Sequence, residues 1–389
     1  MFRIQTMNKI STLGLELFPR DRYEVASEIS NPDAILVRSA DLNDTDIPDS
    51  VLAIARAGAG YNNIPVQRCS EKGVAVFNTP GGNANAVKEL TLAALLVASR
   101  DIVGGINWTS SIKDSANVGE LVEKEKTRFT GPELWGKTLG VVGLGAIGVM
   151  VANDATALGM DVIGYDPYIS VDAAWSLSRK VIRADTFESL LTKSDYISLH
   201  VPLSDTTRGL LSAKNFHLMK KDVRIINLAR NALVNDREII EALQAGKLGA
   251  YVTDFPTTDL LSCKKVICIP HLGASTPEAE DNCAIMAARQ LIDFLEAGTL
   301  RNSVNFPRCK LDQRAPYRLL AANRNIPNMV GQITTILAGA NINITDLINH
   351  HRDEYAYNII DTEQQIPGHV LDRISSVDGI IRVRVIEKK

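Results

Sequence analysis

Cysteine is scarce in this sequence, with five residues among 389, and no two of them form a CxxC pair. Zinc fingers and ribbons need closely spaced pairs, and a disulfide-rich fold needs many more cysteines for its length. The odd number and scattered positions instead favour reduced thiols. The sequence therefore predicts neither a bound metal nor a disulfide framework. The cysteines lie at positions 69, 263, 268, 283 and 309.

An excess of positive charge is also lacking. The 42 Lys and Arg stand against 45 Asp and Glu, for a formal net charge of -3, which argues against nucleic acid as a partner. No apolar run approaches the length of a membrane span, and residues 1–11 contain no apolar segment followed by a small-residue cleavage site. These absences favour a cytoplasmic protein without a membrane partner. The length is enough for two or three domains, each with its own core.

Glycine, by contrast, is concentrated in the segment GLGAIG at 143–148, which directly follows an apolar run at 137–142. Residues 146–158 then carry apolar side chains at helical spacing, and a second apolar run at 161–165 ends at Asp166. This order of strand, glycine turn, helix, strand and acid is typical of a dinucleotide-binding βαβ unit.

Each of the three glycines has an expected part in binding a dinucleotide. Gly143 makes the tight turn, Gly145 lets the backbone approach a pyrophosphate, and Gly148 lets the helix pack on the strand, with the phosphates facing the helix N-terminus. Asp166 is expected to accept hydrogen bonds from the adenosine ribose and to repel a ribose phosphate. Because no Arg stands nearby to bind that phosphate, the sequence predicts NAD rather than NADP.

The rest of the chain predicts an α/β protein with a different C-terminal part. Residues 1–92 alternate short apolar strands with helical stretches, and strands continue after the glycine motif. Residues 113–126 are polar and are expected to be a solvated excursion. A linker at 308–316 leads into 317–389, whose pattern predicts the order βαββαβ of a ferredoxin-like module.

Two candidate catalytic residues come directly after predicted strands. Arg230 follows a strand at 223–228, and His271 follows a strand at 266–269. Ligands bind at the carboxyl ends of the strands of an open parallel sheet, so both side chains are expected on one edge. Oxidation of a 2-hydroxy acid needs a base for the hydroxyl proton and a cation for the carboxylate and the developing carbonyl oxygen. Taken singly, Arg230 could equally be a surface ion-pair partner and His271 an ordinary loop histidine.

Seven stretches spread over the chain resemble the D-isomer-specific 2-hydroxyacid dehydrogenases. The combination is specific, although no single stretch is. They are RSADL at 38–42, RAGAGYNNIPV at 56–66, GGNANAVKEL at 81–90, GLGAIG at 143–148, HVPLSDTTRGLL at 200–211, INLARNALVN at 226–235 and PHLGASTPEAEDN at 270–282.

The resemblance implies roles for particular residues. Arg230 would bind the substrate carboxylate, His271 would be the catalytic base and Asp254 would hold the nicotinamide carboxamide. Further cofactor contacts are implied for Ala146, Ile147, Val201, Pro202 and Thr207, and substrate contacts for Arg38, Ser39, Ala59, Gly60 and Asn83.

The resemblance also implies a domain plan. An NAD-binding Rossmann domain at 93–274 would be inserted in a smaller, flavodoxin-like substrate domain made of 1–92 and 275–308. Residues 314–389 resemble an ACT domain, an amino-acid-sensing unit, and a homodimer or homotetramer is expected.

The activity implied is NAD-dependent oxidation of 3-phospho-D-glycerate to 3-phosphohydroxypyruvate, the first step of L-serine biosynthesis. Two alternatives remain open. One is a dehydrogenase for another D-2-hydroxy acid, and the other is a non-catalytic sensor of NAD or an amino acid.

The catalytic region departs from the family pattern at two places. The family usually has a Glu that orients the catalytic histidine. When the sequence is aligned on Phe-Pro-Thr at 255–257, Thr258 occupies the position of this Glu; when it is aligned on Asp254, Asp259 can serve in its place. We favour Asp259. Asn231 stands where the family usually has Gly, and asparagine tolerates a left-handed backbone.

The C-terminal module also departs from its pattern. The usual His-x-Asn-x-Pro-Gly reads NRNIPN at 323–328, so two of the usual contacts are altered. The amides of Asn325 and Asn341 remain able to bind a serine effector, because an amide donates to a carboxylate and accepts from an ammonium. The alternative is that both are plain turn and capping residues.

Overall fold

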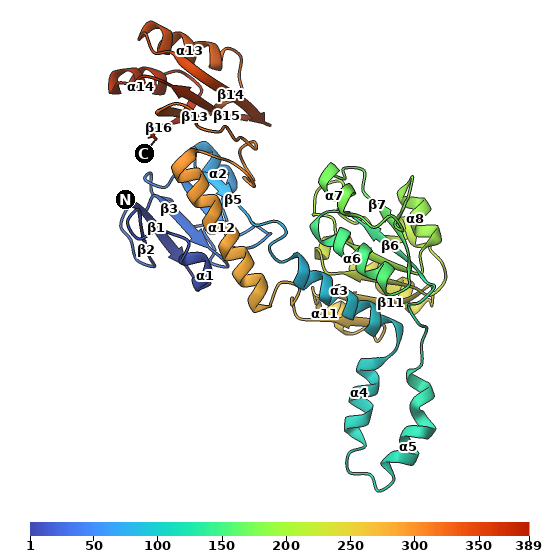
Figure 1. Cartoon of the computed structure of the whole chain (residues 1–389). Coiled ribbons are helices and arrows are strands. Elements are labelled where there is room, and N and C mark those ends of the chain that lie inside the picture. The colour runs from blue at the N-terminus through green and yellow to red at the C-terminus, as the bar shows by residue number, and fades with distance from the viewer. Residues whose placement is uncertain (389) are drawn as a thin grey trace. The chain divides into compact units, whose positions relative to one another are not determined.

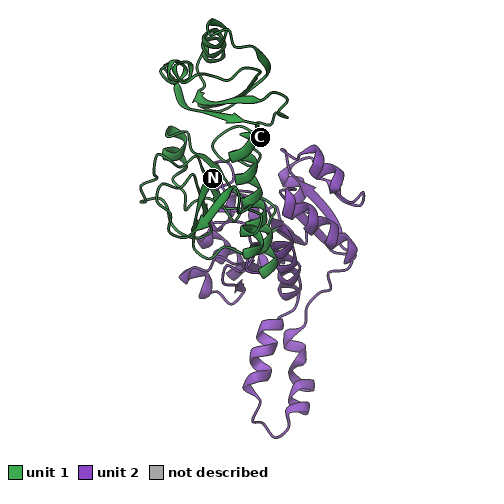
Figure 2. Cartoon of the chain, turned by 60° about the vertical axis from the view of Figure 1, so that its left-hand side comes forward, with its two compact units in different colours: residues 1–83, 277–389 green, residues 84–276 purple. Residues whose placement is uncertain are grey.

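The computed structural model describes residues 1–388 and divides into two compact units (Figures 1 and 2). The first unit combines Met1–Asn83 with the segment that begins at Pro277, and the second is Ala84–Thr276. No helix within residues 1–388 has both the length and the apolar character needed to cross a membrane.

The first unit begins with a parallel sheet of five strands in the order β2-β1-β3-β4-β5. This is the flavodoxin-like order, so the predicted fold of this part is confirmed. The strands are β1 (Phe2–Met7), β2 (Tyr23–Ala26), β3 (Ala34–Val37), β4 (Ala53–Arg56) and β5 (Ala75–Phe77), and the helices are α1 (Thr12–Leu15), α2 (Val66–Glu71) and α12 (Pro277–Ala297).

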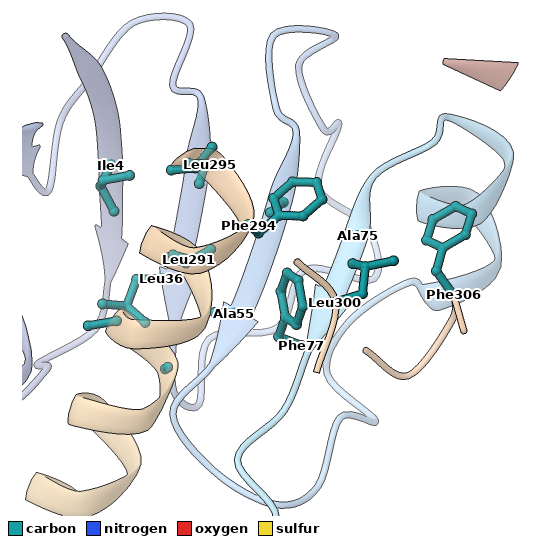
Figure 3. Close-up of a cluster of buried hydrophobic side chains, with 14 of the residues drawn as sticks. Ile4, Leu36, Ala55, Ala75, Phe77, Leu291, Phe294, Leu295, Leu300 and Phe306 are labelled. Atoms are coloured by element: carbon teal, nitrogen blue, oxygen red, sulfur yellow. The ribbon is translucent and has the colours of Figure 1, made fainter. Parts of the chain in front are cut away.

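The long helix α12 completes the core of this sheet. Its side chains Leu291 and Phe294 pack in one cluster with Ile4, Leu36 and Phe77 of the strands (Figure 3). A strand buried on both faces, such as β3, reads as an uninterrupted apolar run, which is why the short strands were visible in the sequence.

The C-terminal part of the same unit is a four-stranded antiparallel sheet in the order β14-β15-β13-β16, and the predicted βαββαβ order is confirmed. Alternate residues of β13 face opposite sides, as strand geometry requires. Leu319 packs against the two helices of this part, whereas Leu320 joins the cluster of α12. The elements are β13 (Tyr317–Arg324), α13 (Met329–Gly339), β14 (Ile344–Arg352), β15 (Tyr355–Thr362), α14 (Gly368–Ser375) and β16 (Ile380–Glu387).

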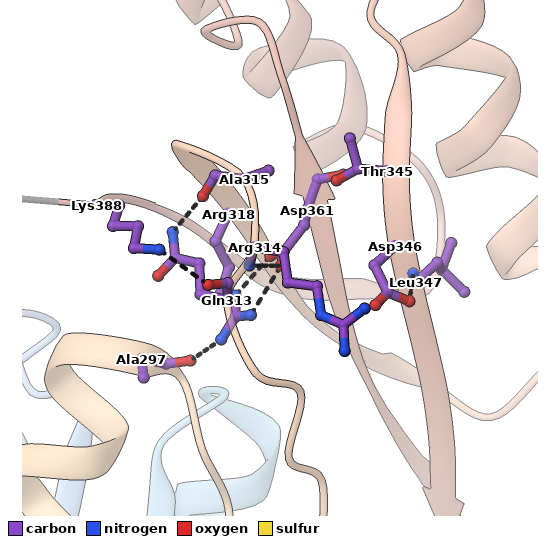
Figure 4. A network of polar contacts seen from close by, with 10 residues as sticks. All are labelled: Ala297, Gln313, Arg314, Ala315, Arg318, Thr345, Asp346, Leu347, Asp361 and Lys388. Carbon is purple, nitrogen blue, oxygen red and sulfur yellow. Dashed lines mark hydrogen bonds and ion pairs between the residues drawn. The ribbon is translucent and has the colours of Figure 1, made fainter.

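A buried ion pair lies where this sheet meets α12 (Figure 4). Arg318 and Asp361 are both 0% exposed, and the guanidinium donates to both carboxylate oxygens, from Nε to Oδ1 at 2.6 Å and from Nη2 to Oδ2 at 2.9 Å. The remaining Nη1 donates to the carbonyl of Ala297 at the end of α12, at 2.9 Å. Such two-point pairing satisfies both charges away from water.

The second unit is built on a parallel sheet of seven strands in the order β12-β11-β10-β9-β6-β7-β8. The order reverses at β6, as in a Rossmann fold, and this prediction is confirmed. The strands are β6 (Thr138–Val142), β7 (Asp161–Tyr165), β8 (Ile182–Arg183), β9 (Tyr196–Leu199), β10 (Val223–Asn227), β11 (Leu248–Thr253) and β12 (Val266–Cys268).

Helices pack on this sheet, and two of them extend away from it. The polar stretch 113–126 is largely helical, and α4 and α5 form an arm without a single buried residue (Figure 1). The helices are α3 (Ala84–Ser99), α4 (Ile102–Ser111), α5 (Val118–Glu125), η1 (Lys126–Phe129), α6 (Ala146–Ala157), α7 (Val171–Ser176), α8 (Phe187–Lys193), α9 (Ala213–Phe216), η2 (Asn231–Leu233), α10 (Asp236–Gln244) and α11 (Thr258–Leu261).

Candidate active site

The three glycines at 143–148 differ in what surrounds them. Gly143 has φ +91°, and a Cβ there would lie 2.8 Å from the backbone carbonyl of His200. A Cβ on Gly148 would collide with the carbonyl oxygen of Gly143, so the first turn of α6 can approach β6 only without a side chain. Next to Gly145, however, nothing lies within 4 Å. The open position is therefore the one where a phosphate would meet the N-terminus of α6, which Ala146 and Ile147 begin.

Asp166, directly after β7, points its carboxylate back to the glycine segment. Its Oδ2 accepts from the backbone N of Leu144 and its Oδ1 from the backbone N of Tyr168, both at 2.8 Å. Asp166 forms no ion pair with Lys or Arg anywhere in residues 1–388, so its charge stays available to a ribose hydroxyl and opposed to a phosphate.

Three side chains come together at the carboxyl ends of β10, β11 and β12. Asp254 directly follows β11, and its carbonyl accepts from the backbone N of His271 at 3.1 Å. Burial raises the pKa of the Asp254 carboxyl, while the nearby charges of His271 and Arg230 oppose that rise. Asp254 is only 1% exposed, and its Oδ1 has no partner in the described structure. Arg230, Asp254 and His271 thus form one electrostatic cluster.

Asp259 lies elsewhere. It is an exposed residue in the first turn of α11. Burial raises the pKa of the nearby Asp236 carboxyl, and the charge of Asp259 adds to that rise. The structure described for residues 1–388 gives it no contact with His271. The assignment of Asp259 as the acidic partner stays a prediction, and Asp254 is the carboxylate that the structure places beside His271.

Asn231 begins the short turn η2 and does not have a positive φ. The tolerance of asparagine for a left-handed backbone is therefore not needed at this position, because the chain turns here with ordinary 3-10 geometry. No glycine is needed after Arg230.

The loop after β9 is braced by its own hydroxyl groups. The hydroxyl of Thr207 donates to the carbonyl of Pro202 at 2.6 Å and accepts from the backbone N of Ser204 at 2.8 Å. This holds the segment that begins at Val201 in a fixed turn. Thr207 therefore has a local structural role that is compatible with the expected cofactor contact.

His200 was not singled out from the sequence, although it begins the stretch HVPLSDTTRGLL. Its Nε2 lies 2.8 Å from the hydroxyl of Ser198, and burial lowers its pKa to about 4. The imidazole is therefore neutral at physiological pH, next to the turn at Gly143.

The first unit carries the expected substrate residues at the carboxyl ends of its own strands. Arg38 follows β3 and forms an ion pair with Glu280 of α12, with 2.7 Å between Nη2 and Oε1. The backbone N of Ser39 donates to Asn8 at 3.2 Å. Both residues are thus anchored to neighbouring segments.

The loop after β4 is held by a chain of amides that sequence reasoning missed. Gln290 of α12 donates to the carbonyl of Asn78 at 3.0 Å, and Asn78 donates to the carbonyl of Ala59, next to Gly60, at 2.6 Å. The Oδ1 of Asn83 is buried without a partner in the described structure. An acceptor left unpaired in this way is available to a ligand.

The two candidate effector residues make turn contacts. Asn325 donates to the carbonyl of Asp353 at 3.1 Å, and Asn341 has φ +58° just after α13. These are the contacts of ordinary turn and capping residues. Within residues 1–388, no three or more His, Cys, Asp or Glu side chains gather in a way that could hold a metal ion.

Known proteins resemble the chain in sequence. Residues 92–273 match the family model for the D-isomer specific 2-hydroxyacid dehydrogenase, NAD binding domain. The D-3-phosphoglycerate dehydrogenase of Methanocaldococcus jannaschii is 37% identical over 339 residues, covering 84% of this chain and 61% of that protein. The Bacillus subtilis protein of the same name is 33% identical over 354 residues, covering 85% and 64%. The chain thus spans about three fifths of the length of these relatives.

A solved structure supports the same likeness. The NAD+-bound 3-phosphoglycerate dehydrogenase of Entamoeba histolytica matches 78% of this chain and 98% of that chain, with a TM-score of 0.60 and 25% identity. The resemblance predicted from the motifs, including the NAD-binding domain, is confirmed by these matches. None of these matches names an ACT domain.

Proposed function

We propose that this chain is an NAD-dependent dehydrogenase that oxidises 3-phospho-D-glycerate to 3-phosphohydroxypyruvate, the first step of L-serine biosynthesis. The observation that carries the proposal is the cluster of Arg230, Asp254 and His271 on the same sheet edge as the open position at Gly145. The similarity to D-3-phosphoglycerate dehydrogenases supports the choice of substrate.

The roles of the residues follow from their chemistry. The guanidinium of Arg230 would bind the substrate carboxylate through two parallel hydrogen bonds. His271 would accept the hydroxyl proton at an imidazole nitrogen while a hydride leaves the carbon that bears this hydroxyl. Bound NAD supplies the hydride acceptor. The free Oδ1 of Asp254 fits the donor of a carboxamide, and its negative charge would stabilise the imidazolium that forms on His271.

The substrate would also be held by residues of the first unit. Arg38, Ser39, Ala59, Gly60 and Asn83 are the proposed contacts, supported by the unpaired Oδ1 of Asn83. We further propose three domains, at 1–92 with 275–308, at 93–274 and at 314–389, and a cytoplasmic location.

The arrangement of subunits belongs to the same proposal. We propose a homodimer or homotetramer, because the arm of α4 and α5 exposes Ile106 at 61% and Val103 at 43%. Exposed apolar side chains on helices without buried residues are typical of surfaces that a partner covers. Sedimentation of the full chain measures the number of subunits.

The C-terminal module is proposed to be an ACT domain that binds L-serine near Asn325 and Asn341 where two copies meet. The βαββαβ order supports this proposal. Serine would lower activity only by favouring a less active arrangement of the domains. Its effect is therefore limited by the difference between its affinities for the more active and the less active arrangement.

An NADH-forming assay with a panel of D-2-hydroxy acids, with and without serine, tests the function. Highest kcat/KM with 3-phosphoglycerate supports it, whereas another preferred acid favours the broader dehydrogenase. Absence of turnover together with NADH binding would favour a sensor. Calorimetry with the full chain tests serine binding separately.

A further inference from the structure

We propose that Asn227 is a positioning residue that fixes the backbone of Arg230 and thereby aims its guanidinium. The inference rests on the proposed role of Arg230. Asn227 is the last residue of β10 and is 0% exposed, so its side chain meets no solvent. A buried amide needs hydrogen-bond partners, and its partners identify what it does.

The amide of Asn227 binds both backbone polar groups of Arg230. Its Nδ2 donates to the carbonyl of Arg230 at 2.9 Å, and its Oδ1 accepts from the backbone N of Arg230 at 3.4 Å and of Ala229 at 3.2 Å. The turn that carries Arg230 is thus closed around one side chain. The guanidinium itself donates to the carbonyl of Ala229 and forms no ion pair with a carboxylate anywhere in residues 1–388.

Tyr251 on the neighbouring strand fixes the orientation of this amide. Its hydroxyl accepts from Nδ2 of Asn227 at 3.2 Å. Burial raises the pKa of Tyr251, while hydrogen bonds from Asn227 and Thr253 oppose the rise, so the hydroxyl stays protonated. Nδ2 points toward the Arg230 carbonyl and the Tyr251 hydroxyl. A flip of the amide would place Nδ2 against the backbone N–H groups of Ala229 and Arg230, and Oδ1 against the Arg230 carbonyl.

The hydrogen-bonding capacity of Asn227 is used up within the protein. Both Nδ2 hydrogens and both lone pairs of Oδ1 have partners, which leaves none for substrate. Asn227 therefore acts through Arg230. Aspartate could not donate to the Arg230 carbonyl, which would keep only its 3.3 Å bond from the backbone N of Leu233. An apolar residue would in addition leave the backbone N–H groups of Ala229 and Arg230 unpaired.

The test compares Asn227→Ala, Asn227→Asp and Tyr251→Phe in the full chain. Asn305→Ala is the matched control, because Asn305 is a buried asparagine of the first unit with as many bonds, to Ser70, Val74, Val76 and Ser303. The measurements are KM for the acid that the parent oxidises, the NADH dissociation constant and the melting temperature.

We expect Asn227→Ala to raise KM by about tenfold to a hundredfold, because a misplaced binding group costs that much. Asn227→Asp keeps the acceptor and should show a smaller rise, and Tyr251→Phe the smallest. NADH affinity should stay within about twofold, while Asn305→Ala should lower the melting temperature without changing KM.

A folded Asn227→Ala with KM close to the parent overturns the inference, and so does an equal KM rise in Asn305→Ala. If Asn227→Ala does not fold, KM of Asn227→Asp and Tyr251→Phe decides by the same criterion. Arg230→Lys is measured alongside. If Arg230→Lys loses most of its activity while the Asn227 variants keep the parental KM, only this inference is rejected. If Arg230→Lys turns over normally, the proposed role of Arg230 is rejected, and this inference with it.

Discussion

Two buried carboxylates of this chain are treated in opposite ways. Asp361 in the C-terminal sheet is fully buried and bound at both oxygens by Arg318. Asp254, directly after β11, is almost as deeply buried, yet within residues 1–388 its Oδ1 has no partner, and its Oδ2 accepts a long bond, at 3.4 Å, from the backbone N of Gly273. A structural carboxylate is satisfied within the protein, whereas Asp254 retains capacity for a ligand, and its charge is favoured by nearby His271 and by the bond from Gly273.

Of the changes near Asp254, the removal of the His271 side chain should reduce activity the most. His271→Ala should lower kcat by about 10²–10⁴-fold, because it would remove the proposed base for the hydroxyl proton. NADH binding, followed by fluorescence, should persist. Turnover within a few-fold of the parent would remove His271 from the mechanism.

Breaking the Asp361 pair should destabilise the C-terminal part. Asp361→Ala leaves Arg318 buried without a counter-charge, which costs about 3–5 kcal/mol. All three tryptophans, at 108, 135 and 175, lie in the other unit, so denaturant unfolding should show an earlier transition by circular dichroism and an unchanged one by Trp fluorescence. The double change Arg318→Met with Asp361→Leu is the control, since removing both charges should restore much of the loss. Unchanged unfolding of Asp361→Ala would contradict the argument.

Arg230→Lys tests whether the cation near Asp254 must also be planar. The charge is kept, but lysine could not form the two parallel bonds proposed between Arg230 and the substrate carboxylate, so kcat/KM should fall by about a hundredfold. Steady-state kinetics with the preferred acid measures this. Near-normal activity would mean that the carboxylate is held elsewhere, most plausibly by backbone amides around Gly60.

Asp254→Asn should separate function from stability. Burial raises the pKa of Asp254 in the folded state, so the ionised form destabilises the fold above that pKa, and the penalty fades as the pH falls toward the usual range of Asp. The amide should therefore melt higher at neutral pH, by about 2–4 °C for each kcal/mol gained, with a smaller gain in acid. Activity should fall at the same time. A lower melting temperature at neutral pH would show that Asp254 is a structural carboxylate like Asp361.

Asp166→Ser should have the smallest effect. Losing the charge that opposes a ribose phosphate should shift the NAD to NADP preference by about tenfold, or 1.4 kcal/mol. The ratio of kcat/KM for the two cofactors measures it, and Ser198→Ala, beside His200, serves as a control outside the ribose site. A parent that already uses both cofactors equally would contradict the assignment.

Local patterns in the sequence were enough to predict the dinucleotide unit and the βαββαβ module. The glycines at 143, 145 and 148 and the acid at 166 act through the backbone next to them, and buried parallel strands appear as apolar runs. Arg230 and His271 could be proposed because both follow strands. The acidic partner of His271 could not be decided from the sequence, and Asp259 stays a prediction. The structure shows Asp259 exposed on α11, whereas the pairing of β11 with β12 brings Asp254 near His271.

The sequence by itself determined the elements, their order and the residues at the ends of strands, because those depend on periodicity and on conformations available to single residues. Only the tertiary structure decided which polar groups are satisfied. The amide of Asn227 closes on Arg230, the charges of Arg318 and Asp361 neutralise each other across β13 and β15, and one oxygen of Asp254 stays free. Burial and hydrogen-bond partners arise from segments distant in the chain, and the free energy of a buried polar group depends on both.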